Sequence, residues 1–374
     1  MRKKSGFKLV MVLLLSGLLM VWGAGAALAD SSSGTATGTQ QLTVQQALAM
    51  AIATSPSLIS SSYSIDQAKN KVNQETEPIT ALNNLTFTPT GYTSSANEGT
   101  LNNLVAANLN WNQAEKDQQA AQDTVTYEVY SDYFAILQDE VSLAAAQQAF
   151  NLAGLQQRVT NLNYQVGGAS QQAVVQENQS YAAAQTSLAT AKANLDTDYQ
   201  KFNQLVGLAT DDRPVLTDQP SFAPLVIGSL DAEVSRVLAS DPDISSAQNS
   251  VTEQKEALTV VSQDPAANAS SADTLGEAEQ SLTNEQNSVS QSERNLYYSI
   301  QNIESNQDSL QQALTTAQTN LAMTQVEYNV GLATEIDLQT AQSNLNSAQL
   351  ALLKNTVSHQ LDVMAFETPW AAGA

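Results

Sequence analysis

Few side chains in this sequence are of a type that catalyses a reaction or binds a metal ion. The 374 residues include no cysteine and one histidine, His359, which lies in a helical pattern and is expected to be a packed or surface residue. Cysteine nucleophiles, disulfide frameworks and His/Cys zinc sites are therefore excluded. Acidic residues such as Asp139 and Glu140 are scattered over helical segments without metal-ligand spacing, and no glycine-rich phosphate loop follows a strand. We expect no enzymatic activity, no cofactor and no bound metal.

Two short motifs stand out instead, because each combines a tyrosine, a glycine and a hydroxyl residue. They are Tyr-x-Val-Gly runs at 164–167 and 328–331, followed by Ser170 and Thr334 respectively. Glycine readily adopts the left-handed conformation that ends a helix, and serine or threonine can cap the helix that follows. Each motif therefore predicts the tip of a long helical hairpin, at 164–169 and at 328–334.

The composition favours long helices that pack through small residues. Charged residues make up only 14% of the chain, and the polarity comes from Gln, Asn, Ser and Thr mixed with many alanines. The net charge is −22, and removal of the four basic residues of the N-terminal segment would leave −26. Nucleic acid is therefore excluded as a partner, because binding phosphates requires a basic surface. A lumen with this charge would favour cations.

Residues 1–29 have the features of a cleavable export signal. A basic start is followed by an apolar run over 9–22 and by the small-x-small sequence Ala27-Leu28-Ala29. An uncleaved N-terminal anchor is the alternative. Residues 30–41, rich in Ser, Thr and Gly, predict a flexible lead-in to the mature protein.

A first helical repeat is predicted over 42–206. Its opening helix is capped by Thr43 and interrupted at Pro56, because the residue before proline avoids the helical conformation. A second helix is expected to end just before Pro78.

The middle of this repeat changes character. Two runs of alternating apolar and polar residues, 85–90 and 105–111, predict a small β-hairpin at about 84–112. A helix over about 113–163 then leads into the first tip, and a helix over about 170–205 returns from it.

The same scheme restarts after a proline-containing linker at 207–229. The second helical repeat covers 230–366, with a break at Pro242, a polar loop at 262–272 and a short tail at 367–374. Apolar residues then recur at every seventh position, which is typical of a supercoiled helical seam. These residues are Leu275, Leu282, Val289, Leu296, Ile303, Leu310 and Ala317.

The two repeats are copies of unequal length. Pro56 and Pro242 are 186 positions apart, whereas Tyr164 and Tyr328 are 164 apart, so the second copy is 22 residues shorter between these landmarks. The missing residues fall where the first copy has its predicted β-hairpin. The predicted fold class is therefore mainly α, with duplicated long antiparallel coiled-coil hairpins and one small β-hairpin insert in the first repeat.

These features together resemble the TolC-like outer-membrane efflux family over nearly the whole mature chain. The most specific segments are 42–48 with 55–58, and 328–332 leading into 337–342. The resemblance implies an α-barrel protomer and a homotrimer whose helices form a tunnel across the periplasm. It implies an outer-membrane location, with the β-hairpins entering the membrane. The implied partners are a periplasmic adaptor (membrane fusion protein) and an inner-membrane pump.

Position by position, the resemblance assigns adaptor docking to the two tips. The matching residues are Val166 and Gly167 in the first copy, and Val330, Gly331 and Leu332 in the second.

The resemblance also implies a gate at the closed end of the tunnel. Asp337 falls where family members place an inward carboxylate, so three copies would form an acidic ring that attracts cations. Tyr328, with Tyr164 in the first copy, would pack or hydrogen-bond across the closed tip. The alternatives are an exposed helix charge for Asp337 and plain helix-end packing for the tyrosines.

The sequence departs from the family pattern in three places. Thr340 stands where a second acidic residue is usual, and Ala333 stands where some members have a basic residue. In the first copy, Ala173 stands at the position where an acidic residue could lie. We therefore expect a less strongly locked gate. The two predicted strands are also half of the four that a family member supplies, so membrane insertion is expected to be unusual, weak or lost.

We expect a passive conduit component of a tripartite efflux or type I secretion system. The alternative is a secreted structural coiled-coil protein of the cell envelope without transport activity. The adaptor of such a pump is a third reading, but adaptors carry β domains for which this sequence has almost no room.

Overall fold

The computed structural model describes residues 41–82, 95–259 and 265–373. The first repeat consists of β1 (Gln41–Leu42), α1 (Val44–Thr54), α2 (Pro56–Leu82), α3 (Ser95–Gln165) and α4 (Gln171–Val206). The second consists of α5 (Leu230–Ser240), α6 (Pro242–Thr259), α7 (Pro265–Asn329) and α8 (Glu335–Glu367), and between the repeats lies β2 (Val215–Leu216). A 3-10 turn, η1 (Pro369–Ala371), ends the chain. The predicted mainly α fold with duplicated helical hairpins is confirmed.

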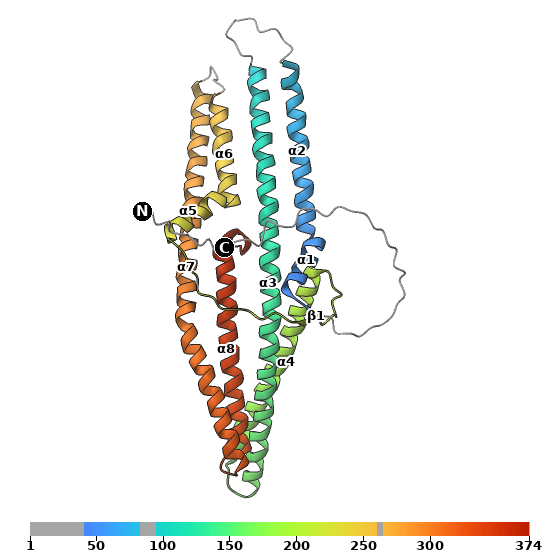
Figure 1. The fold of residues 1–374 in the computed structure, drawn as a ribbon, viewed down its shortest axis with the longest axis vertical. Helices are drawn as coiled ribbons and strands as arrows, with labels where there is room; N and C mark the ends of the chain where they lie inside the picture. Colours follow the sequence, from blue (N-terminus) through green and yellow to red (C-terminus); the bar gives the residue numbers. More distant parts are fainter. Residues whose placement is uncertain (1–40, 83–94, 260–264, 374) are drawn as a thin grey trace, which may run out of the picture. The chain divides into compact units, whose positions relative to one another are not determined.

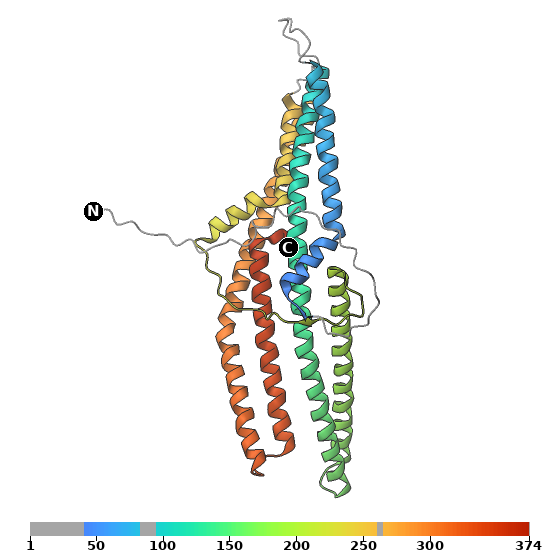
Figure 2. The ribbon, with the colours of Figure 1, turned by 45° about the vertical axis from the view of Figure 1, so that its right-hand side comes forward.

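Two long hairpins run side by side in the unit formed by the residues from Thr39 onward. Helix α3 packs against α4, and α7 packs against α8, while α3 also contacts α8 and so joins the hairpins. At the other end α2 packs on α3, and α6 packs on α7. Both tips therefore lie at the same end, as Figures 1 and 2 show.

The helix breaks lie at the two predicted prolines, Pro56 and Pro242, and helices α1 and α6 each begin with a local polar cap. Thr43 and Gln46 form a capping box before α1, in which each side chain accepts the other residue's backbone N–H, at 3.2 and 3.0 Å. Before α6, the Asp241 carboxylate accepts the N–H groups of Asp243 and Ile244 at 2.9 and 3.0 Å. These bonds satisfy N–H groups that have no partner inside the helix.

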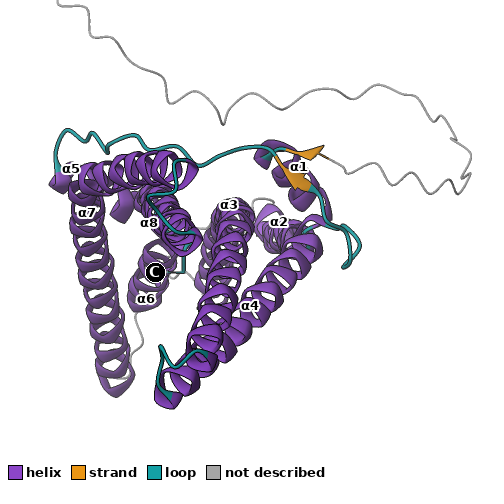
Figure 3. Ribbon diagram, turned by 90° about the horizontal axis from the view of Figure 1, so that it is seen from below, coloured by secondary structure: helices purple, strands orange, loops and turns teal. Residues whose placement is uncertain are grey.

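The main hydrophobic core lies in the first repeat, where α1, α3 and α4 meet the two-stranded parallel sheet. Tyr133, Phe134 and Phe202 form edge-to-face pairs with centroids 5.9 to 6.0 Å apart. The buried Tyr133 hydroxyl donates to the Leu42 carbonyl at 3.0 Å and accepts the Asp218 N–H at 2.9 Å. The core therefore holds β1 and the linker after β2 against α3, at the edge of the bundle (Figure 3).

The second repeat packs through a narrower row of apolar residues than the core of the first repeat. The seven heptad residues lie half-buried along α7 apart from Ala317, which is buried. The linker crosses this hairpin: Leu225 donates its N–H to Glu304 at 2.6 Å, and Phe222 packs on His359 with ring centroids 4.4 Å apart. His359 is buried, and its Nε2 lies 3.0 Å from the Glu304 carboxylate. Of the two predicted alternatives for this histidine, a packed or a surface residue, the packed one is correct.

Among the described residues, amide pairs recur along the helices, and all but Gln342–Asn346 lie on exposed faces. A glutamine donates to the asparagine four residues later at 2.9 to 3.3 Å in five places. Such pairs stabilise a helix surface without ionic charge. They are Gln147–Asn151, Gln280–Asn284, Gln291–Asn295, Gln325–Asn329 and Gln342–Asn346. They explain how helices with so few charged residues keep a polar surface.

The predicted β-hairpin is wrong in its second half. Residues 95–112 belong to α3, while the first predicted strand, 85–90, lies outside the described residues. Leu104, Ala107 and Trp111 are half-buried or buried and share one helical face. The sequence of this segment fits both an alternating strand pattern and a helical pattern. The segment forms a helix because, as part of α3, it packs beside α2 and α6.

Four predicted boundaries also differ. Helix α2 continues past Pro78 to Leu82, and residues 265–272 of the predicted polar loop belong to α7. The linker contains β2, which pairs with β1 where the lead-in was expected to end and the first repeat to begin. The tail 367–374 begins with the end of α8 and η1, and Trp370 donates its ring N–H to Asp123 of α3 at 2.9 Å.

The predicted export signal, 1–29, lies outside the described residues. Within the described ranges, no helix combines the length and apolar character needed to cross a membrane.

Candidate functional site

The two tips are built by the same backbone geometry. In the first, α3 ends at Gln165, and the N–H groups of Gly167 and Gly168 donate to the carbonyls of Tyr164 and Asn163 at 3.1 and 2.7 Å. This is the Schellman arrangement, in which a left-handed residue reverses the chain and satisfies the last helix carbonyls. Gly167 supplies the left-handed residue, with φ of 77°.

The second tip repeats the arrangement. Helix α7 ends at Asn329, and the N–H groups of Gly331 and Leu332 donate to the carbonyls of Tyr328 and Glu327 at 3.1 and 2.8 Å. Gly331 has φ of 78°. The two glycines are required for their conformation rather than for space, because nothing lies within 4 Å of a Cβ built on either one.

The returning helices differ in how they are capped. The Ser170 hydroxyl accepts the Ala173 N–H at 3.2 Å and caps α4. Thr334 does the same for Asp337 at 3.2 Å, and the Asp337 carboxylate accepts the N–H and the hydroxyl of Thr334 at 2.8 and 2.7 Å. The second tip thus has a complete capping box, whereas Ala173 cannot complete one in the first.

Asp337 therefore has a structural partner that the sequence reasoning missed. The signal was present, because Thr334-Glu335-Ile336-Asp337 has the spacing of a capping box. The carboxylate is fully exposed, and its hydrogen bonds from the backbone and hydroxyl of Thr334 lower the pKa of Asp337. It stays ionised at neutral pH.

The apolar tip residues are unusually exposed. Val166 and Leu332 are 83% and 81% exposed, and Val330 is exposed as well. The rings of Tyr164 and Tyr328 are partly exposed, and within the described chain neither hydroxyl has a hydrogen-bond partner. The structure thus brings each tyrosine next to its own glycine turn, and Figure 2 shows the two tips ending as separate loops.

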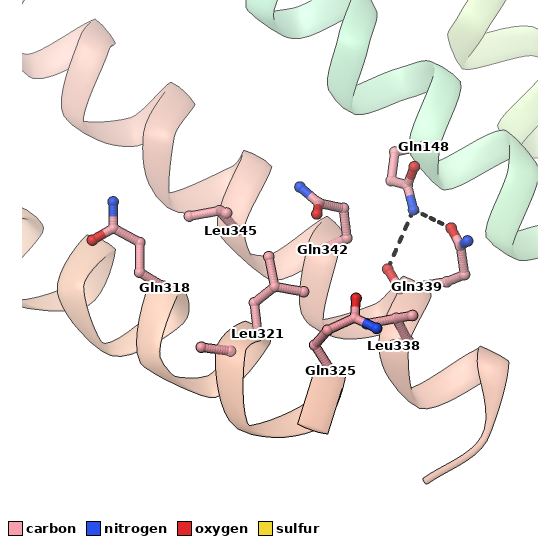
Figure 4. A pocket seen from close by; sticks show the side chains of 9 residues that line it. Gln148, Gln318, Leu321, Gln325, Leu338, Gln339, Gln342 and Leu345 are labelled. Carbon is pink, nitrogen blue, oxygen red and sulfur yellow. Dashed lines mark hydrogen bonds between the residues drawn. The ribbon is translucent and has the colours of Figure 1, made fainter. Parts of the chain in front are cut away.

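A groove near the second tip joins the hairpins. Its volume is about 480 Å³, and uncharged residues of α3, α7 and α8 line it. The Gln148 amide donates to the Gln339 side chain and, at 3.5 Å, to the Gln339 carbonyl, so one α3 side chain bridges to α8 (Figure 4). Gln325 and Gln342 face the same groove. Amides of this kind bind hydrogen-bonding groups, and no titratable side chain lines the groove for acid–base chemistry.

Comparison with known proteins defines the fold class. No family model matches the sequence, and no curated protein matches it. Solved structures of channel proteins do match. CusC, which forms a transmembrane channel, has 13% identity over 94% of this chain and 99% of its own, with a TM-score of 0.63.

Two further matches are outer-membrane proteins. The CmeC outer membrane channel of Campylobacter jejuni has 14% identity over 88% of this chain and 86% of its own, with a TM-score of 0.63. VceC of Vibrio cholerae has 14% identity over 88% and 96%, with a TM-score of 0.60. The chain therefore has a TolC-like fold. These neighbours are channel proteins rather than enzymes.

Proposed function

We propose that this protein is a passive conduit component of a tripartite efflux or type I secretion system. It is exported, assembles as a homotrimer in the outer membrane, and its tips dock onto a periplasmic adaptor that connects it to an inner-membrane pump. The observation that carries the proposal is the pair of tips: two turns of the same geometry lie at one end of the helical unit and expose valine and leucine side chains.

Exposed apolar residues at the end of a rigid hairpin favour a docking role. Large apolar side chains exposed at neighbouring positions commonly mark a protein–protein contact. Val166, Val330 and Leu332 are held by Schellman turns rather than by loose loops, so little conformational entropy is lost when a partner binds. The TolC-like fold of the chain supports this reading.

The gate proposal rests on Asp337, Tyr164 and Tyr328. In a homotrimer, three Asp337 carboxylates at the tip end would form an acidic ring that attracts cations and repels anions. The capping box fixes each carboxylate at the first turn of α8. The two tyrosines would close the tip by packing or hydrogen bonding with a neighbouring protomer.

Substitution of the tips tests the conduit proposal. Val166→Asp with Leu332→Asp places charges on both docking surfaces, and we expect cells carrying this variant to lose resistance to dyes and detergents or to lose protein export. Val226→Asp is a matched control, because Val226 is 90% exposed but lies in the linker. Deletion of the gene without change in either phenotype would contradict the proposal.

A structural coiled-coil protein of the envelope is the second candidate. The observation in its favour is that α3 continues through 95–112, where the sequence predicted a membrane-entering strand. Electron microscopy of the purified protein separates the two: a hollow trimeric cylinder supports the conduit, and an extended bundle without a lumen supports the structural role.

A further inference from the structure

One carboxyl group in the second repeat is buried without a described hydrogen-bond partner. Glu293, on α7, is 1% exposed, and neither of its carboxylate oxygens has a donor within reach among the described residues. A buried carboxylate in this state is costly, because nothing replaces the hydrogen bonds that water would make to it. The group is far better accommodated when it is protonated and neutral.

The charges that act on Glu293 come from α5. Arg236 lowers the pKa of this carboxyl and Glu233 raises it, but burial is the largest influence and brings the pKa to about 7. Glu293 therefore changes charge near neutral pH, where an ordinary glutamate is already ionised.

Arg236 connects the charge of Glu293 to the contact between α5 and α8. Its Nε donates to Glu233 at 2.7 Å, and its two other nitrogens donate to the carbonyls of Glu367 and Phe366 at 3.0 and 3.3 Å. The guanidinium thus clamps α5 onto the C-terminal end of α8, where η1 begins. The same side chain is the cation that acts on Glu293.

The other charged groups named around this joint are either paired or exposed. Asp231 of α5 pairs with Arg294 of α7, the Asp241 carboxylate caps α6, and Asp362 of α8 accepts the Ser299 hydroxyl at 3.0 Å. Glu367 at the end of α8 is exposed. Arg236, whose ion pair with Glu233 lies within α5, is consequently the cation that can move toward an ionised Glu293.

We propose that Glu293 is a proton-operated latch between α5, α7 and the end of α8. When the carboxyl is neutral, Arg236 holds the Phe366 and Glu367 carbonyls and the joint is closed. When the carboxyl loses its proton to solvent, the new carboxylate draws Arg236 toward itself, and the two α8 carbonyls lose their donor. The end of α8 and α5 then open locally. This inference does not depend on the conduit function.

Hydrogen exchange in the full-length protein tests the latch. After correction for the intrinsic pH dependence of exchange, we expect the amides of 230–240 and 365–373 to exchange on the order of tenfold faster at about pH 8.5 than at about pH 5.5. Glu293→Gln, which is neutral and of the same shape, is expected to stay protected at both pH values. The control is Glu277→Gln, on an exposed position of α7, which should behave as the wild type.

Two results would overturn the latch. One is a wild type whose corrected exchange in these segments does not change with pH, and the other is a Glu293→Gln variant that keeps the wild-type pH response. If the glutamine variant does not fold, the ionisation of wild-type Glu293 is followed by carboxyl NMR with labelled glutamate. A glutamate titrating near pH 7 supports the latch, and its absence rejects it.

Discussion

The two long hairpins share one tip geometry but differ in how their stems are held together. The α3–α4 stem contains an aromatic core with Tyr133, Phe134 and Phe202, and all members of the main core cluster except Val357 come from the first repeat or the linker. The α7–α8 stem has half-buried heptad residues along α7, and its buried apolar residues, such as Ile300, Ala317 and Phe366, lie outside the main core cluster. The same Schellman turn closes both stems.

The comparison shows that tip and stem are separable parts of the hairpin. The turn depends on hydrogen bonds between residues at most five positions apart, so it forms whatever core lies behind it. The stem depends on contacts between distant segments, and these differ between the repeats. We infer that the first repeat is the stable half of the protein and that the second is easier to deform.

The largest difference should appear when the stem cores are truncated. Phe202→Ala removes a fully buried ring and is expected to lower the free energy of unfolding by about 3–5 kcal/mol. Leu310→Ala, at a half-buried heptad position of α7, should lower it by about 1–2 kcal/mol. Urea unfolding measures both values, and similar losses would show that the two stems are equally well packed.

Alanine at the tip glycines should affect both hairpins alike. Gly167→Ala and Gly331→Ala place a Cβ on residues with φ of 77° and 78°, which costs about 1–2 kcal/mol in each case. Gly168→Ala is the control, because Gly168 does not have positive φ. Hydrogen exchange at the two helix ends follows the effect, and unequal losses would mean that the turns are not equivalent.

Removal of the helix caps should destabilise the two tips to different extents. Ser170→Ala and Thr334→Ala each remove a side-chain cap, at a cost of about 0.5–2 kcal/mol, and the loss should be greater for Thr334 because its capping box is complete. Ala173→Asp should build the missing half of the box and protect the first turn of α4 against exchange. No gain in protection would show that the box at the second tip contributes little.

Acidification should loosen one tip and leave the other unchanged. The folded-state pKa of Asp337 lies below its ordinary value of 3.8, so its stabilising effect is present above pH 3.8 and is lost as the pH falls through the folded-state value. We expect the exchange protection of the Thr334 amide to fall in that range, while the Ser170 amide does not respond. Asp337→Asn should remove the dependence, which NMR-detected exchange can follow residue by residue.

The features that were predictable from sequence depend on neighbouring residues. Thr43, Pro56 and Pro242 mark helix ends through caps and excluded conformations, and Gly167 and Gly331 mark the turns. The capping box at Asp337 was equally local and was readable from Thr334 three positions earlier. The docking and gating roles of the tips stay predictions, because they concern partners outside the chain.

The errors arose where one sequence pattern suits two structures. Residues 105–111 alternate like a strand, yet Leu104, Ala107 and Trp111 also share a helical face, and only the neighbouring helices select between them. Pro78 was expected to end α2, but it stands inside the helix. A local preference is worth a few kcal/mol at most, so packing over a long helix can override it.

By itself, the sequence determined the helical class, the duplication, the breaks and the two tips, because each of these follows from periodicity or from bonds within one turn of chain. Only the tertiary structure decided which groups meet across long separations: Tyr133 with Leu42, His359 with Glu304, and Arg236 with the end of α8. It also decided that Glu293 is buried without a described partner while a similar residue such as Glu277 is exposed. Burial depends on the packing of separate segments, and no single helix encodes it.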